Sequence, residues 1–294
     1  MMTDTKDLEY LVDLFDDPDV QVASALDKKI RQGGPELLDA LRNMAIDTKD
    51  EARRDIINRK FIYYSAASVL DQLEQYAALA KKEEATLLEG AYLISALLTP
   101  GYKRAAFYDD LIPLIGEIMS ETSEDKTAVE NARILNHIFY NRYRFTATDP
   151  FSFSEDNSLF INVIEKRRGN PVAISVLYFA VAHAAGLPVF PLCFKGGFVP
   201  VYVENGKVLF YLNVFHKGEI FLQDNLSAMM ASQGLNLDPG SMVIKKDATI
   251  LTMYMELIAF YYDQKGNKDM VELLAKAMSY FGNQRYMVID EDDE

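Results

Sequence analysis

The sequence of 294 residues contains no tryptophan, a single cysteine and three histidines. With only Cys193 available, the chain cannot form an internal disulfide or a thiolate-rich metal cluster. His137, His183 and His216 fall on separate segments, so we expect no histidine-rich metal site. A glycine-rich phosphate loop, a dinucleotide fingerprint and a serine-elbow motif are also missing. Together these absences predict a protein with no metal and no cofactor.

Long apolar runs are absent as well, and positive charge is scarce. No stretch of about 18 apolar residues occurs, which argues against a membrane-spanning helix. Segment 1–17 is acidic and lacks a basic start followed by an apolar run, so we expect no secretory signal and a cytoplasmic location. Lysine and arginine number 30 against 44 acidic residues, a net charge of −14. This charge predicts that neither nucleic acid nor an anionic membrane is a partner, whereas a protein or peptide, including a basic one, remains open.

The sequence does contain ample apolar material, much of it in helical spacing. Apolar residues make up 49% of the chain and charged residues 25%, which is enough for a full core. The apolar residues from Leu8 to Phe15 recur at spacings of three and four and so form one helical stripe. Asp17 is positioned to cap the next helix with Pro18 in its first turn, and Gly33-Gly34 ends it. This helix, turn, helix and Gly-Gly stop resemble one HEAT-type unit, which must pack against the neighbouring helices because one unit cannot bury its own face.

The middle of the chain changes from helices to strands. Helical spacing continues to about Arg142, and a polar and aromatic stretch at 149–160 predicts a loop. The segment from Pro171 to Ala185 is apolar on all sides, which is typical of a helix buried all round. Branched and aromatic residues then predict an antiparallel sheet with a two-residue hairpin at Asn205-Gly206. The expected strands are 189–194, 198–204, 208–215 and 219–222, and a loop is expected over 224–246.

The last folded part is predicted to be a helix pair, 248–264 and 268–281, joined at Gly266-Asn267. Aromatic residues facing across such a turn resemble one tetratricopeptide unit. The expected fold class is α+β and predominantly helical: a helical N-terminal part, a core with a small antiparallel sheet, and a C-terminal helix pair. The expected divisions are a HEAT-like helical part at 1–82, a core at 83–246, a tetratricopeptide-like helix pair at 247–285 and an acidic tail at 286–294.

Several motifs of the core occur in the order of a known family. They are Leu135-Asn136-His137-Ile138-Phe139, Arg167-Arg168-Gly169-Asn170-Pro171 before the buried helix, Gly186-Leu187-Pro188 after it, and the strand motifs Lys195-Gly196-Gly197-Phe198 and Leu212-Asn213-Val214-Phe215. In this arrangement residues 84–281, about two thirds of the chain, resemble the SirB-type branch of the transglutaminase-like superfamily. The resemblance implies a transglutaminase-like core with a helix pair at its C-terminal end.

The superfamily implies a cysteine at the start of the buried helix, a histidine on one strand and an aspartate on the next. The helix N-terminus lowers the pKa of the thiol, the histidine accepts its proton, and the aspartate orients the imidazole ring. The SirB-type branch generally lacks this cysteine but usually keeps the histidine and the aspartate. Here the cysteine position reads Pro171 or Val172, the histidine position Gly197 and the aspartate position Asn213. Because glycine has no side chain and asparagine carries no charge, we expect all three positions to be chemically silent.

Other residues in this region are candidates for a catalytic or anion-binding role. Cys193 could act as a displaced nucleophile with His216, although a cysteine on a buried strand normally behaves as a small hydrophobe. The Arg167-Arg168 pair could bind an anion at the helix start, or could order the turn by bonding carbonyls and carboxylates. For His137 and His183, and for Asn136, we expect structural polar contacts.

The leading hypothesis is therefore a non-catalytic protein- or peptide-binding or scaffold protein that keeps a degenerate transglutaminase-like cleft as its binding surface. The alternative is a cysteine-dependent hydrolase or transamidase that uses Cys193 as a displaced nucleophile. A purely structural role in a larger complex is a third possibility, and the sequence sets no oligomeric state. The residues assigned to the degenerate cleft are Arg168, Asn170, Val172, Gly197, Asn213 and His216.

Overall fold

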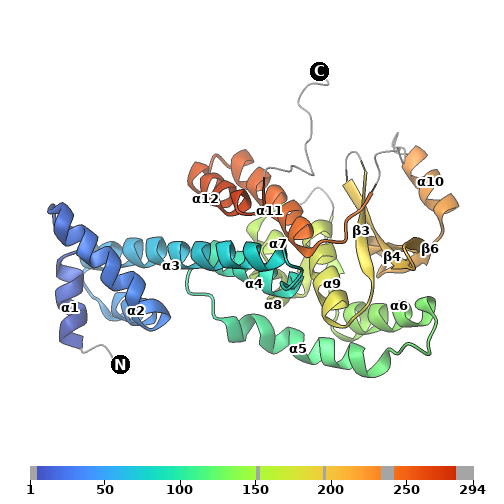
Figure 1. Cartoon of the computed structure of the whole chain (residues 1–294), viewed down its shortest axis with the longest axis horizontal. Coiled ribbons are helices and arrows are strands. Elements are labelled where there is room, and N and C mark those ends of the chain that lie inside the picture. Colours follow the sequence, from blue (N-terminus) through green and yellow to red (C-terminus); the bar gives the residue numbers. More distant parts are fainter. Residues whose placement is uncertain (1–4, 150–152, 195–196, 233–241, 283–294) are drawn as a thin grey trace, which may run out of the picture. The chain divides into compact units, whose positions relative to one another are not determined.

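The computed structural model describes residues 5–149, 153–194, 197–232 and 242–282, which form two compact units (Figure 1). The first unit takes residues 1–73 and 96–103, and the second takes residues 74–95 and 104–294. The fold is mostly helical with a small antiparallel sheet, which confirms the predicted α+β class. The divisions expected at residues 82 and 246, and the HEAT-like and tetratricopeptide-like assignments, stay predictions, and the acidic tail lies outside the described residues.

The first unit is built from helices α1 (Thr5–Asp13) and α2 (Val20–Asp47) and from the first part of α3 (Glu51–Ala80). The predicted stripe on α1 is buried and packs against the apolar faces of the two longer helices. This cluster contains Leu8, Leu11, Val12, Phe15, Leu26, Ile30, Leu37, Leu41, Ala45, Ile57 and Tyr64. Both α3 and α4 (Leu87–Leu98) contribute residues to each of the two units.

One detail predicted for this unit is wrong, the position of the helix cap. The cap of α2 is Asp19, whose carboxylate accepts the Gln21 N–H at 2.7 Å, while Asp17 accepts the Asp19 N–H and so lies before the helix. The stop predicted at Gly33-Gly34 is confirmed. Gly34 leaves the helical conformation, with φ 58° and ψ −156°, and Pro35 starts a second helical segment, so α2 consists of two helices joined at a kink.

The second unit surrounds helix α9 (Pro171–Ala184). Every residue from Ala173 to Ala182 is buried, as its all-apolar sequence predicted, and the helix contacts α5, α8, α11 and the sheet. Gly186 follows with φ 78°, the left-handed conformation in which glycine commonly ends a helix. The other helical elements are α5 (Arg104–Glu121), α6 (Ala128–Asn136), the π-helical turn η1 (His137–Arg142), α7 (Glu155–Ser158), α8 (Phe160–Lys166), α10 (Gln223–Ser232), α11 (Asp247–Gln264) and α12 (Lys268–Ser279).

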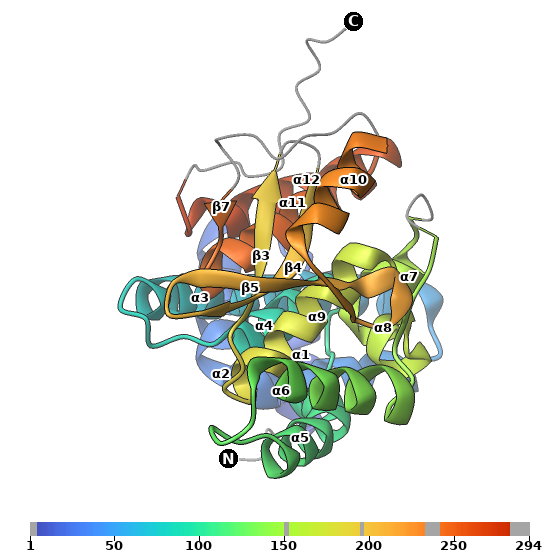
Figure 2. The same cartoon turned by 90° about the vertical axis from the view of Figure 1, so that its right-hand side faces the viewer.

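The main sheet of this unit is antiparallel, with strand order β6-β5-β4-β3-β7. Positive φ at Asn205 and Gly206 makes the predicted two-residue hairpin between β4 and β5. Phe198 packs against Phe179 of α9 on one sheet face, and Leu226 of α10 packs on the other, so the two helices lie on opposite faces (Figure 2). The strands are β3 (Val189–Phe194), β4 (Gly197–Glu204), β5 (Lys207–Asn213), β6 (Glu219–Phe221) and β7 (Met242–Val243), and a separate parallel pair joins β1 (Thr146–Ala147) to β2 (Arg168–Gly169).

Both predicted loops contain regular structure. Helix α7 is a single turn inside the expected loop 149–160, closed by the Ser154 N–H bonded to the Asn157 side chain at 2.9 Å. Helix α10 and strand β7 lie inside the expected loop 224–246, of which residues 233–241 are outside the described ranges. Elements this short show no apolar period, so hydrophobic spacing alone does not detect them. No helix in the described parts of the chain is long and apolar enough to cross a membrane.

Helix α10 depends on Leu226, which is 0% exposed, whereas Leu222 just before the helix is 62% exposed. We predict that Leu226→Ala lowers the free energy of unfolding by about 2–5 kcal/mol, because it leaves a cavity under the helix. Leu222→Ala is the matched control and should change stability by less than about 0.5 kcal/mol. Urea unfolding followed by circular dichroism measures both, and equal effects would contradict the assignment of Leu226 as the anchor.

Candidate functional site

The first turn of α9 carries no nucleophile. Pro171 and Val172 occupy its first two positions, both half-buried, and neither has a hydroxyl or a thiol. Asn170 precedes them as the cap, and its Oδ1 accepts the Ala173 N–H at 2.8 Å. The first hydroxyl in the helix, that of Ser175, donates to the Pro171 carbonyl at 2.7 Å. The polar groups at this helix start are therefore used to satisfy the helix itself.

Asn170 is fully buried and also ties three elements together. Its Nδ2 donates to Ser158 Oγ at 2.8 Å, and its backbone N–H donates to the Asn157 carbonyl at 2.6 Å. The Tyr254 hydroxyl of α11 donates to the Ser158 carbonyl at 2.6 Å. The sequence placed Asn170 in the cleft, and the structure gives it a buried capping role. That role could have been predicted, because asparagine before proline is a favoured helix start.

The histidine position, Gly197, opens β4 opposite Phe194. A Cβ at this position would meet only the Phe194 ring, at 3.6 and 3.7 Å, so a side chain has room. Side chains alternate along a strand, and Phe198 faces α9. A side chain at position 197 would therefore point to the opposite face of the sheet, away from α9.

The aspartate position, Asn213, ends β5 two residues earlier than predicted and begins the 3₁₀ turn η2 (Val214–His216). Its Oδ1 accepts the Phe215 N–H at 3.0 Å, and its Nδ2 lies 2.9 Å from Nδ1 of His216. An amide nitrogen only donates, so His216 Nδ1 accepts and the ring proton sits on Nε2. His216 is exposed, and its neighbour Asn213 acts as the cap of the turn.

Asn136 connects this turn to α9. The Tyr178 hydroxyl donates to Asn136 Oδ1 at 2.6 Å, and Asn136 Nδ2 donates to the Gly218 carbonyl at 2.6 Å. Gly218 has φ 73°, and a Cβ there would collide with the Asn136 amide. The structural contact expected of Asn136 is thus present. The same expectation for His137 is wrong, because its side chain is exposed at the start of η1.

His183 is the hydrogen-bonded core residue that the sequence predicted. Its Nδ1 lies 2.7 Å from Asp247 Oδ1, and its Nε2 lies 2.7 Å from the Val189 carbonyl. Asp247 Oδ2 in turn accepts the Leu87 N–H at 2.7 Å. Both ring nitrogens are occupied by structural partners, so His183 has none left for a substrate. No sequence pattern pointed to Asp247, which lies 64 residues further along the chain.

Cys193 lies on β3, and its Sγ contacts the Met253 sulfur at 3.8 Å. Burial raises the pKa of this thiol to about 12. Cys193 pairs with Phe198 and shares its sheet face, whereas Asn213 lies on the opposite face by alternation from Tyr211. The strands β3 and β5 are also separated by β4, a distance of about 10 Å. The structure therefore does not bring Cys193 together with Asn213 or His216.

The two arginines before α9 differ. Arg167 adopts φ 55°, pairs with Asp110 at 2.8 Å and stacks over the Phe145 ring at 4.9 Å, so it orders the turn. Arg168 is exposed, and its backbone pairs with Thr146 in the short parallel ladder. Among the described residues, no group of three or more histidine, cysteine, aspartate and glutamate side chains is placed to hold a metal ion.

A buried helix packed on an antiparallel sheet, with the motif positions at the helix start and on two adjacent strands, defines the class as a transglutaminase-like fold. A family model described as the transglutaminase-like superfamily matches residues 105–253, about half of the chain. The chain therefore belongs to the transglutaminase-like superfamily.

Curated relatives add little to this assignment. A UPF0162 protein from Vibrio cholerae is 23% identical over 175 residues, which cover 58% of this chain and 64% of that protein. A UPF0162 protein from Pasteurella multocida is 29% identical over 101 residues, covering 34% of this chain and 37% of that protein. The chain thus spans less than two thirds of the length of either relative. No solved structure gives a significant match.

The contact between Asn136 and Gly218 leads to a stability prediction. Gly218→Ala should cost about 1–2 kcal/mol for the left-handed backbone and about 1 kcal/mol more for the displaced Asn136 hydrogen bonds. Gly206→Ala, in the hairpin turn at φ 75° with nothing within 4 Å of its Cβ, should show the backbone cost alone. Chemical denaturation measures the difference, and equal losses in the two variants would contradict a role for the Asn136 bridge.

Proposed function

We propose that this chain is a non-catalytic protein- or peptide-binding protein of the SirB-type branch, in which the transglutaminase-like fold serves as a scaffold. The observation that carries the proposal is the start of α9, where the superfamily has a cysteine and this chain has Pro171 and Val172 after the buried capping residue Asn170. Asn213 supports it, because its amide caps a turn where the superfamily uses a carboxylate. HEAT-like and tetratricopeptide-like ends, if they form as the sequence predicts, would present further binding surfaces in a cytoplasmic protein.

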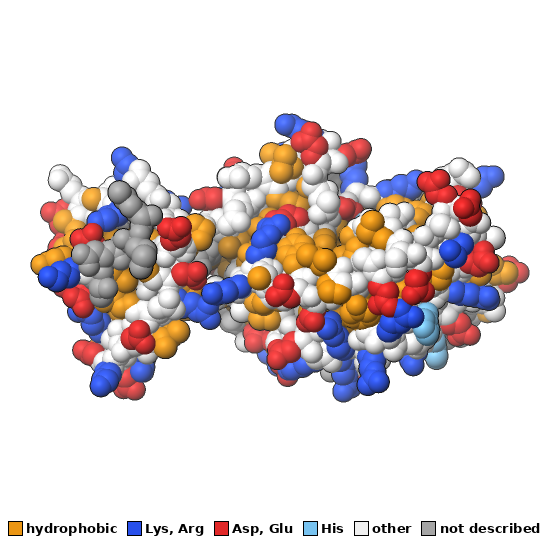
Figure 3. Space-filling view, turned by 90° about the horizontal axis from the view of Figure 1, so that it is seen from below, with side chains coloured by type: hydrophobic (Ala, Val, Ile, Leu, Met, Phe, Trp, Pro, Cys, Tyr) orange, Lys and Arg blue, Asp and Glu red, His pale blue; other side chains and the backbone are white. Residues whose placement is uncertain are grey.

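Exposed apolar side chains support a binding role. On α5, Ile112 is 60% exposed and Met119 is 57% exposed, and Phe215 beside His216 is 55% exposed. Figure 3 views the molecule from the side on which α5 lies in Figure 1 and shows hydrophobic side chains gathered between acidic and basic ones. Apolar surface rimmed by charge is typical of protein interaction sites. A protein or peptide therefore fits this surface better than a nucleic acid does.

The alternative, a hydrolase or transamidase that uses Cys193, has less support. A nucleophilic thiol needs a lowered pKa and a base within hydrogen-bond reach. The contact of Cys193 is the Met253 thioether, and burial shifts its pKa upward. His216, the base that this alternative requires, lies beyond the strand on the far side of β4 and is bonded to Asn213.

The thiol provides the first test. With a pKa near 12, Cys193 is ionised in only about one molecule in a thousand at pH 9, and less at lower pH. We predict that iodoacetamide alkylates the native protein slowly from pH 5 to 9 with no plateau, because the thiolate fraction still rises throughout this range. In urea the alkylation rate should rise with pH to a plateau, with its midpoint at about pH 8.5, the pKa of a free thiol.

Mass spectrometry of the alkylated protein measures this rate, and Cys193→Ala is the control for reaction at other residues. Rapid alkylation of the native protein, with a rate whose midpoint lies below about pH 8, would identify a reactive thiolate and would contradict the non-catalytic proposal.

A second test restores two of the three superfamily residues. We predict that Gly197→His with Asn213→Asp leaves the fold intact, because position 197 has room for a side chain. It should restore no esterase, amidase or transamidase activity, because the α9 start still lacks a thiol and a histidine at 197 would point away from that helix. Circular dichroism checks the fold and generic acyl substrates check turnover; cysteine-dependent turnover would contradict the account.

A further inference from the structure

One stretch of the sheet has an unpaired edge. Strand β6 pairs with β5 only from Tyr211 to Asn213, so the earlier part of β5, from Lys207 to Phe210, has no neighbour on the β6 side among the described residues. After Phe221 the chain leaves the sheet and starts α10 at Gln223. Backbone N–H and C=O groups on an open edge can pair with another extended strand.

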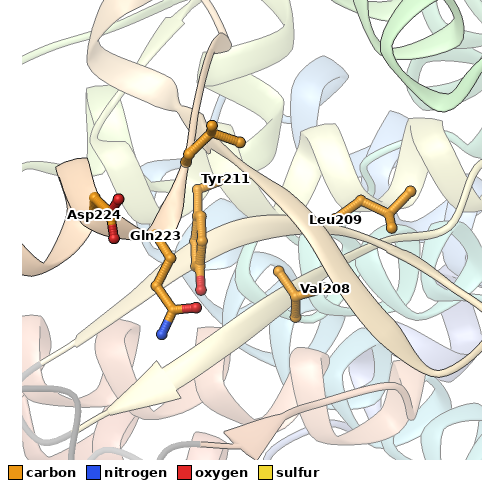
Figure 4. A pocket seen from close by; sticks show the side chains of 6 residues that line it. Val208, Leu209, Tyr211, Gln223 and Asp224 are labelled. Atoms are coloured by element: carbon orange, nitrogen blue, oxygen red, sulfur yellow. The ribbon is translucent and has the colours of Figure 1, made fainter.

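A pocket of about 250 Å³ adjoins this open edge (Figure 4). Val208, Leu209 and Tyr211 of β5 line it on one side. Leu222, Gln223 and Asp224 line it from the start of α10. Its volume suits one or two side chains of medium size.

Two leucines contribute exposed apolar surface to a pocket whose accessible lining is otherwise mostly polar. Leu209 is 40% exposed and Leu222 is 62% exposed. Leu209 is the extra residue of a β-bulge, since Val208 pairs with Val203 and Phe210 pairs with Tyr202. The buried Tyr211 ring, stacked on Phe221 at 5.6 Å, lies between the two sides of the pocket.

Charge at the pocket favours one kind of occupant. Asp224 lines it, and no described residue forms an ion pair with this carboxylate. The whole chain carries −14, which adds to the attraction for a cation. A basic side chain next to an apolar one therefore matches the pocket.

We propose that this site, the open segment of β5 with the pocket beside α10, binds an extended peptide segment of a partner protein as an added strand. The segment places an apolar side chain in the pocket and a lysine or arginine against Asp224. This proposal rests on the binding function proposed above, but it assigns that binding to a surface at the other end of β5 from Asn213.

A second copy of the chain is a poorer fit for the same edge. Two copies that pair through β5 would bring two acidic molecules together, and each would place its own Asp224 close to the other's acidic surface. Like charges placed together in an interface oppose association.

Selection from a displayed library of random 12-residue peptides on the full-length protein tests the proposal. Enriched peptides should carry alternating apolar residues next to lysine or arginine. In fluorescence polarisation with the best synthetic peptide, Asp224→Lys should weaken binding at least about tenfold, and exchanging the peptide's basic residue for glutamate should restore it. Glu165→Lys, at an exposed acidic residue on α8, is the control and should change affinity less than about twofold.

Backbone pairing is tested separately. A peptide N-methylated at alternate residues loses the N–H groups that an added strand needs, and it should bind at least about tenfold more weakly. If no peptide is enriched, or if neither Asp224→Lys nor N-methylation weakens peptide binding, the proposed site is wrong. The proposed non-catalytic function would then still be supported by slow alkylation of Cys193. If light scattering shows a dimer that Leu209→Asp converts to monomer, the occupant is a second copy and the proposal fails.

Discussion

The second unit depends on the burial of helix α9 from Ala173 to Ala182. The free N–H group of Ala173 in the first turn is buried away from water, so the protein must supply an acceptor for it. Asn170 supplies one, and because its side chain is itself buried, its amide protons must be satisfied by Ser158. Tyr254 then donates to the Ser158 carbonyl, which draws α11 to the same place. One requirement at a helix start thus orders three elements around it.

The need to cap the start of α9 also affects which side chains are available there for catalysis. In an active member of the superfamily the same helix start activates a thiol by its partial positive charge. Here the two half-buried positions that follow the cap are a proline and a valine. The electrostatic advantage of the helix start remains, but the chain places no side chain there that could exploit it. The polar groups at this helix start bond to the helix itself or to its neighbours and contribute to stability.

Long apolar segments were predicted well, and short polar ones were not. The limits of α9 and β3 follow from continuous apolar sequence and from Gly186, and the β4–β5 hairpin follows from Asn205-Gly206. Helices α7 and α10 were missed because one turn closed by a cap, or one buried leucine, leaves no period in the sequence. Among the site residues, the assignment of Gly197 and Asn213 to the superfamily's histidine and aspartate positions stays a prediction from the motifs. The Asn136 bridge and the bond between His183 and Asp247 could not be predicted, because they join residues 82 and 64 positions apart, a separation that no local pattern records.

The cap at Asn213 has a consequence for substitutions in this turn. An amide both accepts and donates, and Asn213 uses both capacities, toward the Phe215 N–H and toward His216. A carboxylate at this position would accept on both sides, so the imidazole would have to move its hydrogen from Nε2 to Nδ1 to keep the contact. Exchange of asparagine and aspartate is thus coupled to a tautomer change in a neighbour three residues away. His216 can therefore accompany either residue at position 213, because only the position of its ring hydrogen has to change.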